Sequence, residues 1–419
     1  MTTTKADRVA QTVLSQFDKL PSKSKPKVRD NGLHEWVPLS GIVAEWQGVY
    51  TCLALATGMK CLPASKIAES NGIVLHDWHA EILAIRTFNR YLLDECRSLV
   101  IHGTVSSVVE RAPGLECPFR IRDGVKLHMY CSEAPCGDAS MELTMAAQDD
   151  ASPWDASTDP PRTGGGLVGR EFFSQLGVVR RKPGRRDAPP TLSKSCSDKL
   201  ALKQCTSLLG SLTSLLVDPS NAYIGTLVVP SSQYTHVGYT RSFSADGDDD
   251  SGGGGGRLSA LKDAEWSSPE DSSSSSSSRY SFRPFIVETT DREFRFSKRR
   301  VMERASSMSI SASNLAAAWS AAGLQEVILG GVLQGRKTSD VRGAARTSRR
   351  QMFLAARDLA GRLENGSRAD DALGTRVYAE VKSHRRLATR RRVKRDVKLM
   401  ALTGWVENRG DDNFCIAEG

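Results

Sequence analysis

The sequence contains no apolar run long enough to cross a bilayer, and residues 1–20 lack the apolar centre of a signal peptide. Its nine cysteines are an odd number and follow no regular spacing, which argues against a disulfide-stabilised secreted scaffold. We therefore expect thiols or metal ligands in an intracellular protein of the cytoplasm, the nucleus or both, with no membrane partner. The sequence is silent on oligomeric state, and a monomer is assumed.

Acidic residues are the minority among the charged groups, with 48 Asp and Glu against 57 Lys and Arg and a formal net charge of +9. Many soluble proteins are mildly basic, so this balance favours a polyanionic partner only weakly. The distribution is more informative, because Arg and Lys crowd residues 336–398. The plain interpretation of such a run is a solvated helix face that binds RNA phosphates.

Two stretches, residues 149–169 and 242–281, are poor in apolar residues and rich in Asp, Ser, Gly and Pro. This composition cannot bury enough apolar surface to offset the entropy lost on ordering, so both are predicted to be disordered inserts in surface loops. The chain as a whole is 39% hydrophobic, which allows a sizeable core. We predict a single domain over residues 33–419, preceded by an N-terminal helix or arm at residues 1–32.

Alternating apolar and polar residues predict a strand at 125–131, and apolar residues at helical spacing predict a helix directly after His79. The same spacing predicts a second helix from Cys196 through Leu216. Strand, loop and helix recur in that order, which favours an α/β fold in which a mixed sheet is flanked by helices and the site lies where helices begin. Further strands are expected at 49–56, 223–229 and 326–333.

Two short motifs stand at such strand-to-helix loops. The tripeptide H-A-E at 79–81 begins one predicted helix, with Asp77 as a possible N-cap, and a P-C pair ending at Cys136 lies between a strand and a helix. H-x-E followed by P-C-x-x-C is the signature of zinc nucleobase deaminases. Here the position three residues after Cys136 is Ala139, so the second cysteine of the signature is missing.

A catalytic zinc site needs three protein ligands and an open position for water, so one ligand must come from elsewhere in the chain. Cys196 is the best candidate, because it begins a predicted helix, where the dipole lowers the pKa of a thiol. His79, Cys136 and Cys196 would then hold Zn²⁺. Glu81, too close to His79 to ligate comfortably, would carry the proton of the bound water.

Each motif taken alone has a plainer interpretation. A lone H-A-E is usually chance and a lone P-C-G-D is a turn, whereas isolated cysteines such as Cys131 and Cys205 are small apolar core residues. The metal-site prediction therefore depends on the three motifs occurring together, each at a boundary between a strand and a helix.

At these residues the sequence resembles the adenosine deaminases that act on RNA, most closely the fungal members that act on tRNA. The resemblance implies a cytidine-deaminase-like core with a helical, basic C-terminal extension of the same domain. It also implies hydrolytic deamination of adenosine to inosine in tRNA, at position 37 beside the anticodon of alanine tRNA. The matching stretches are 57–61, 77–86, 132–141, 177–185, 195–199, 330–337 and 404–408.

The resemblance further implies an inositol hexakisphosphate buried among cations, which makes physical sense because buried cations cost several kcal/mol unless a polyanion neutralises them. It implies a relay from that phosphate through Lys199 and Asp77 to Lys182 near the metal-bound water. RNA contacts are expected from Lys60, Arg180 and Arg185. The expected phosphate-binding positions are Arg86, Lys199, Ser211, Lys337, Lys382, Lys394 and Trp405.

Some positions depart from the family pattern. The related editors carry an Arg-Trp pair where this chain has Leu202-Lys203, and a lysine where it has Asn408. No stretch typical of a double-stranded-RNA-binding domain precedes the core, which favours compact tRNA over long duplex RNA. The alternatives are an editor of other structured RNA, a deaminase of free nucleosides or cytidine, and a non-catalytic RNA-binding relative.

Overall fold

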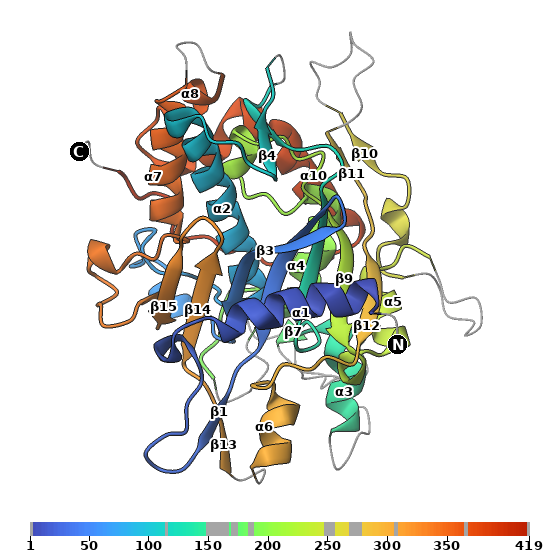
Figure 1. The fold of residues 1–419 in the computed structure, drawn as a ribbon. Helices are drawn as coiled ribbons and strands as arrows, with labels where there is room; N and C mark the ends of the chain where they lie inside the picture. Colours follow the sequence, from blue (N-terminus) through green and yellow to red (C-terminus); the bar gives the residue numbers. More distant parts are fainter. Residues whose placement is uncertain are drawn as a thin grey trace.

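A mixed β-sheet lies at the centre of the protein (Figure 1). The computed structural model describes residues 3–113, 116–147, 167–168, 175–182, 188–246, 256–267, 279–305, 309–363 and 368–416. Among these residues the strand order is β12-β9-β6-β2-β3-β14-β15-β16, in which β6, β9 and β12 are parallel and the other neighbours antiparallel. The strands are β2 (Leu39–Trp46), β3 (Val49–Thr57), β6 (Lys126–Cys131), β9 (Ile224–Pro230), β12 (Ile286–Thr290), β14 (Leu315–Ser320), β15 (Gln325–Leu329) and β16 (Val332–Leu333).

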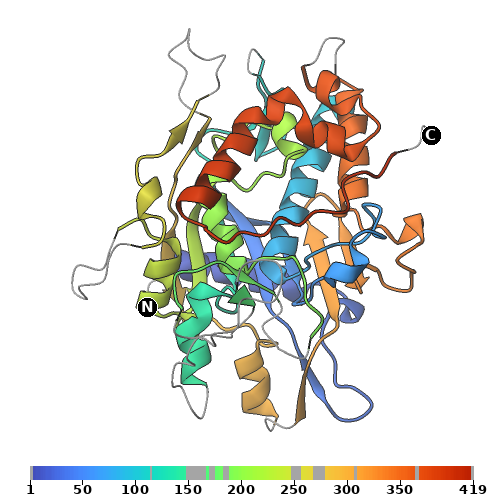
Figure 2. The same cartoon turned by 180° about the vertical axis from the view of Figure 1, so that it is seen from behind.

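Helices cover both faces of this sheet (Figures 1 and 2). Helix α1 (Lys5–Asp18) crosses one face, and α2 (Ala80–His102) and α4 (Cys196–Thr206) pack on the other. The alternation of β2 shows this directly, because Ile42 packs in the core cluster of α2 and its neighbour Val43 in that of α1. Helix α1 begins with a capping box and buries one apolar stripe, so its sequence is suited to lie on a sheet.

The two ends of the molecule carry different elements. β6 and β9 are parallel and end at the same edge of the sheet, where α2 and α4 begin. Helix α6 (Lys298–Arg304) and the strand pair β1–β13 lie at this end, whereas α10 (Ala388–Met400) lies toward the other (Figures 1 and 2). The remaining elements include β1 (His34–Trp36), β4 (Val109–Arg111), β5 (Phe119–Ile121), α3 (Met141–Ala146), β7 (Leu167–Val168), β8 (Arg180–Arg181), α5 (His236–Phe243), β13 (Ile310–Ala312), α7 (Arg349–Ala360), α8 (Arg368–Leu373) and α9 (Tyr378–Ser383).

The predicted α/β class, the strand before Cys136 and the helix after His79 are confirmed. The helix predicted from Cys196 through Leu216 is wrong in length, because α4 ends at Thr206 and Ser207 then takes a positive φ of 56°. The single strand predicted at 326–333 is instead the hairpin β15–β16. Two adjacent glycines with positive φ, at 330 and 331, make its turn.

Much of the two predicted inserts lies outside the described residues, namely 149–166, 169, 247–255 and 268–278. Between the last two gaps the chain buries Leu258 and Leu261 and forms β10 (Glu265–Trp266), which pairs with β11 (Tyr280–Ser281). In the described part of the chain, no helix is long and apolar enough to span a membrane.

Gly137 permits the loop after β6 to approach the start of α4. Its φ is +106°, and a Cβ there would lie 2.3 Å from the Oγ of Ser195. We expect Gly137→Ala to lower the free energy of unfolding by about 2–4 kcal/mol, because strained backbone and a clash combine. Gly124 is the control: its φ is +85° with open space around it, so Gly124→Ala should cost about 1 kcal/mol. Chemical denaturation of both variants measures the difference, and equal costs would contradict this account.

Candidate active site

The first part of the site is the start of α2. His79 is the N-cap residue, and its backbone N–H donates to the Asp77 Oδ1 at 3.0 Å. Asp77 was expected to be the N-cap itself; it instead caps through the residue two positions later. Glu81 follows in the first turn of the helix and is only 6% exposed. One short loop thus brings an imidazole and a carboxylate to the edge of the sheet.

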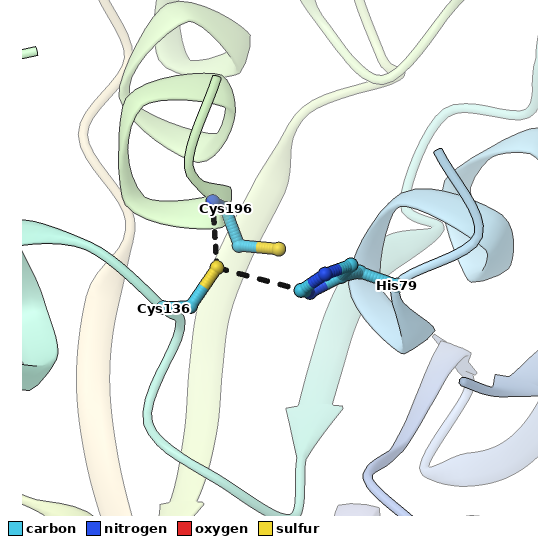
Figure 3. A group of neighbouring side chains, drawn as sticks. All are labelled: His79, Cys136 and Cys196. Atoms are coloured by element: carbon cyan, nitrogen blue, oxygen red, sulfur yellow. Dashed lines mark hydrogen bonds between the residues drawn. The ribbon is translucent and has the colours of Figure 1, made fainter. Parts of the chain in front are cut away.

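The second part is the loop after β6, held against α4. The backbone N–H of Ser197 donates to the Cys136 carbonyl at 3.0 Å, and that of Cys196 donates to the Cys136 Sγ at 3.4 Å. Helix α4 is capped by Ser195, whose hydroxyl accepts from the backbone N–H of Asp198. Cys196 therefore lies at the positive end of a capped helix (Figure 3).

The three predicted ligands meet. The His79 Nδ1 lies 3.8 Å from the Cys136 Sγ, and the ligand atoms of His79, Cys136 and Cys196 all lie within 4.8 Å of one another (Figure 3). A tetrahedral metal bound by thiolate and imidazole would separate sulfur from nitrogen by about 3.6 Å. The donor set and its spacing therefore fit a metal ion with one position left for water.

A second group, Cys61, Asp77 and His79, also places its ligand atoms within 4.8 Å of one another. Its carboxylate is already engaged, because Asp77 Oδ2 accepts from Lys182 Nζ at 2.8 Å, from the Ser193 hydroxyl at 2.7 Å and from Lys199 Nζ. Among the described residues these are the two groups with metal-ligand geometry, and the set with two sulfurs is the less encumbered.

The residues of the predicted relay also meet. Lys182 Nζ bridges Asp77 and the Cys196 Sγ, at 2.8 and 3.2 Å, and both residues of the Lys182–Asp77 pair are buried. Burial alone would raise the pKa of Asp77, but Lys182 and Lys199 hold it well below its ordinary value. Burial alone would lower the pKa of Lys182, but Asp77 and the thiolates raise it well above its ordinary value. Asp77 is therefore a carboxylate and Lys182 an ammonium.

The environment of the site also favours the chemistry of its other groups. A hydrogen bond with Cys196 lowers the pKa of the Cys136 thiol well below its ordinary value, against the effect of burial, and Lys182 adds to it. Burial raises the pKa of Glu81, and the negative charge of Cys136 adds to that shift. A thiolate ready to bind metal thus stands beside a carboxyl group that holds a proton more tightly than an exposed one.

A separate cavity of about 730 Å³ lies between α10 and the segment that follows it. Four of the expected phosphate-binding residues line it: Ser211, Lys382, Lys394 and Trp405. Glu407 is the one carboxylate among the lining residues. The sequence analysis did not single out the further cations that line the cavity, which are Arg390, Arg391, Arg395 and Lys398.

The cations at this cavity repel one another. Burial lowers the pKa of Lys394 well below its ordinary value, and Lys382 and Arg390 lower it further. Lys203 behaves alike, with burial as the main cause and Arg390 next. Lys203 stands where the family carries an aromatic residue, so this departure adds a cation. Such a cluster is costly without a counter-ion, and a polyanion fits it.

The structure places other expected residues elsewhere. Arg86 Nε donates to the Thr347 carbonyl at 2.9 Å, Lys199 is engaged with Asp77, and Lys337 is exposed in the loop after β16; none of the three lines the cavity. Of the expected RNA contacts, Lys60 is half-buried. Arg180 is 1% exposed, so its guanidinium is turned away from a surface phosphate. Arg185 lies outside the described residues.

Comparison with known proteins shows the family. The adenosine-deaminase (editase) domain matches residues 54–409, and the chain belongs to this family. It is 34% identical over 410 residues to tRNA-specific adenosine deaminase 1 of Schizosaccharomyces pombe, covering 96% of this chain and 95% of that protein. It is 34% identical over 240 residues to the Saccharomyces cerevisiae protein of the same name, covering 54% of this chain and 58% of that one. It is 29% identical over 197 residues to the double-stranded RNA-specific editase Adar of Drosophila melanogaster, covering 44% and 28%.

Replacing one sulfur tests the metal site. We expect Cys196→Ser to lower the metal content of the purified protein by about tenfold or more, because a hydroxyl is a poor substitute for a thiolate ligand. Cys415, an exposed cysteine, is the matched control, and Cys415→Ser should keep the metal. Elemental analysis measures both. Equal metal content in the two variants would show that Cys196 is not a ligand.

The cation cavity predicts a pH-dependent stability. Burial, with Lys199 next, lowers the pKa of Lys194 from 10.5 to about 7, and Lys203 and Lys394 shift in the same direction. As pH falls, the unfolded chain takes up these protons before the folded protein does, so the free energy of unfolding should fall between pH 10 and 7. Adding inositol hexakisphosphate should raise the melting temperature and flatten this dependence. Thermal melts of polyanion-free protein test this, and melting curves unaffected by pH and by the polyanion would contradict it.

Proposed function

We propose that this protein is a zinc-dependent hydrolytic deaminase that converts adenosine to inosine in tRNA, at position 37 of alanine tRNA. The observation that carries the proposal is the meeting of His79, Cys136 and Cys196 beside the buried Glu81. The substrate is supported by the similarity, over nearly the whole chain, to a protein named as tRNA-specific. We place the reaction inside the cell, in one deaminase domain that acts as a monomer.

The site residues divide the chemistry between them. His79, Cys136 and Cys196 would hold Zn²⁺, which when bound supplies a water of lowered pKa as the nucleophile. Glu81 accepts the proton of that water as oxygen adds to C6 of the base, and delivers it to the amino group, which leaves as ammonia. One water is consumed and one ammonia released, so Glu81 ends the cycle as it began.

The buried cluster around Asp77 positions these groups. Lys182 stands between Asp77 and the sulfur of Cys196, so it fixes the ligand and contributes a positive charge where negative charge develops. Lys199 extends the same cluster from α4. This arrangement supports the relay expected from the family, although its phosphate end depends on what fills the cavity.

We also propose inositol hexakisphosphate as the structural occupant of the cavity beside α10. Lys382 Nζ already donates to the Ser211 hydroxyl at 2.9 Å, and Trp405 lies between Lys194 and Lys398, each 5.3 Å from the ring centroid. A bound polyphosphate would neutralise these cations, and the residues of the cavity would hold it through charge-assisted hydrogen bonds. Its role is stabilising, because the cavity is separate from the metal ligands.

The substrate is tested by incubating the purified protein with a mixture of tRNAs and locating inosine by sequencing. We expect inosine at position 37 of alanine tRNA and none in free adenosine. Inosine elsewhere in structured RNA would favour a broader editor, turnover of free adenosine at a matching rate would favour a nucleoside deaminase, and binding without inosine would favour a non-catalytic relative.

Glu81 tests the mechanism. Glu81→Gln keeps the shape of the side chain but cannot carry the proton, so we expect inosine formation to fall by about 10²–10⁴-fold. Glu95→Gln, the same change further along α2, should leave the rate within about twofold. Metal content and tRNA affinity are measured in both variants to confirm intact sites. Full activity of Glu81→Gln would rule out the assigned proton transfer.

A further inference from the structure

The segment 292–304 carries an excess of positive charge at the active-site end of the molecule. It contains six cations and two carboxylates. All six cationic residues are exposed, namely Arg292, Arg295, Lys298, Arg299, Arg300 and Arg304. The carboxylates, Glu293 and Glu303, pair with Arg299 and Arg300, so the surface keeps a net positive charge. Isolated surface ion pairs contribute little to stability, so folding does not require so many cations here.

This segment is attached to the loop that carries Cys136. The backbone N–H of Lys298, the first residue of α6, donates to Glu133 Oε1 at 2.9 Å, and Glu133 precedes Cys136 by three positions. The segment is also anchored to α1, because Phe294 packs edge-on against Phe17 with ring centroids 4.8 Å apart. Its cations are therefore presented on a fixed support at the edge of the site.

The positive surface continues onto α1. Arg295 pairs with Asp18 at the end of α1, and Arg292 donates to Gln11 at 2.6 Å. Arg292 also lines a hollow of about 820 Å³ together with Arg8 and Lys19, and no carboxylate is among its lining residues. The Arg8 guanidinium lies 4.7 Å from the centre of the Tyr50 ring, a pair that offers charge and a stacking surface.

The C-terminal basic run, by contrast, spends much of its charge internally. Arg390 is 3% exposed and donates to the Thr206 carbonyl, and Lys394 lines the cavity. Helix α10 packs on α4, which begins at the metal-type site with Cys196, and it lies toward the end of the molecule away from α6 (Figures 1 and 2). A base held beside Glu81 leaves its neighbouring phosphates closer to α6 than to α10.

We propose that the surface formed by segment 292–304 and the α1 hollow is the docking track for the tRNA backbone. This rests on the proposed tRNA substrate and assigns the part of the chain that binds its phosphates. Exposed arginines and lysines in contiguous array bind phosphates without reading sequence and set the register of the RNA. The track thus holds the anticodon arm so that its target base reaches the metal site.

The experiment compares two triple variants of the full chain. Lys298→Gln, Arg299→Gln and Arg300→Gln together remove three charges from α6. The matched control, Arg97→Gln, Arg362→Gln and Arg385→Gln, removes three exposed cations that pair with Asp358 or Asp371, far from the site along the chain's fold. We expect the α6 variant to bind tRNA about tenfold more weakly, with KM raised alike and kcat within about twofold, and its log Kd to depend less steeply on log salt, by about 0.9 per lost contact. The control should bind within about twofold of the unaltered protein.

Melting temperatures show whether each variant is folded, and tRNA binding is read separately from inosine formation. Absence of inosine with the unaltered protein would sink the proposed function, whereas the track would still be judged by binding alone. Unchanged affinity in the folded α6 variant, or an equal loss in the control, would overturn the track. Arg8→Gln with Lys19→Gln tests its extension: about threefold weaker binding is expected, and unchanged binding would overturn the extension onto α1.

Discussion

The buried carboxylate of Asp77 holds the site together. It accepts from the backbone of His79, from the Ser193 hydroxyl and from two lysines, and it is 6% exposed. These donors come from α2, from α4 and from the stretch between β8 and α4, so one group fixes the starts of two helices relative to each other. Removing one partner would leave a buried charge uncompensated, which costs several kcal/mol. The spacing of the metal-type donors depends on this network.

Helix α4 connects two regions of opposite electrostatic character. Its first turn carries Cys196 beside the thiolate of Cys136, and its last turn carries Lys203 within the cation cluster. This order follows the helix dipole, which favours negative charge at the N-terminus and positive charge at the C-terminus. Lys199, between the two, reaches Asp77. A change in the cavity would therefore be felt at the metal-type site through a single short helix.

The ligand set could be predicted from sequence because each donor belongs to a short motif at the boundary of a strand and a helix. The parallel strands then bring those boundaries to one edge. The cavity was predicted only in part. Lys382 and Lys394 line it, whereas Lys337 is exposed and Arg86 bonds to a backbone carbonyl, because tertiary packing decides which cations turn inward. The α6 cations were missed, since a short basic helix is typically a solvated face. Its contact with Glu133 joins residues 165 positions apart, which no local pattern reveals.

X-ray absorption at the zinc edge tests the central claim most directly, because it counts the atoms that bind the metal. The account predicts zinc with two sulfurs at about 2.3 Å and two lighter atoms near 2.0–2.1 Å, from Cys136, Cys196, His79 and a water. The alternative group of Cys61, Asp77 and His79 would give one sulfur and a majority of lighter ligands. A spectrum with one sulfur, or a protein that takes up no zinc, would contradict the account.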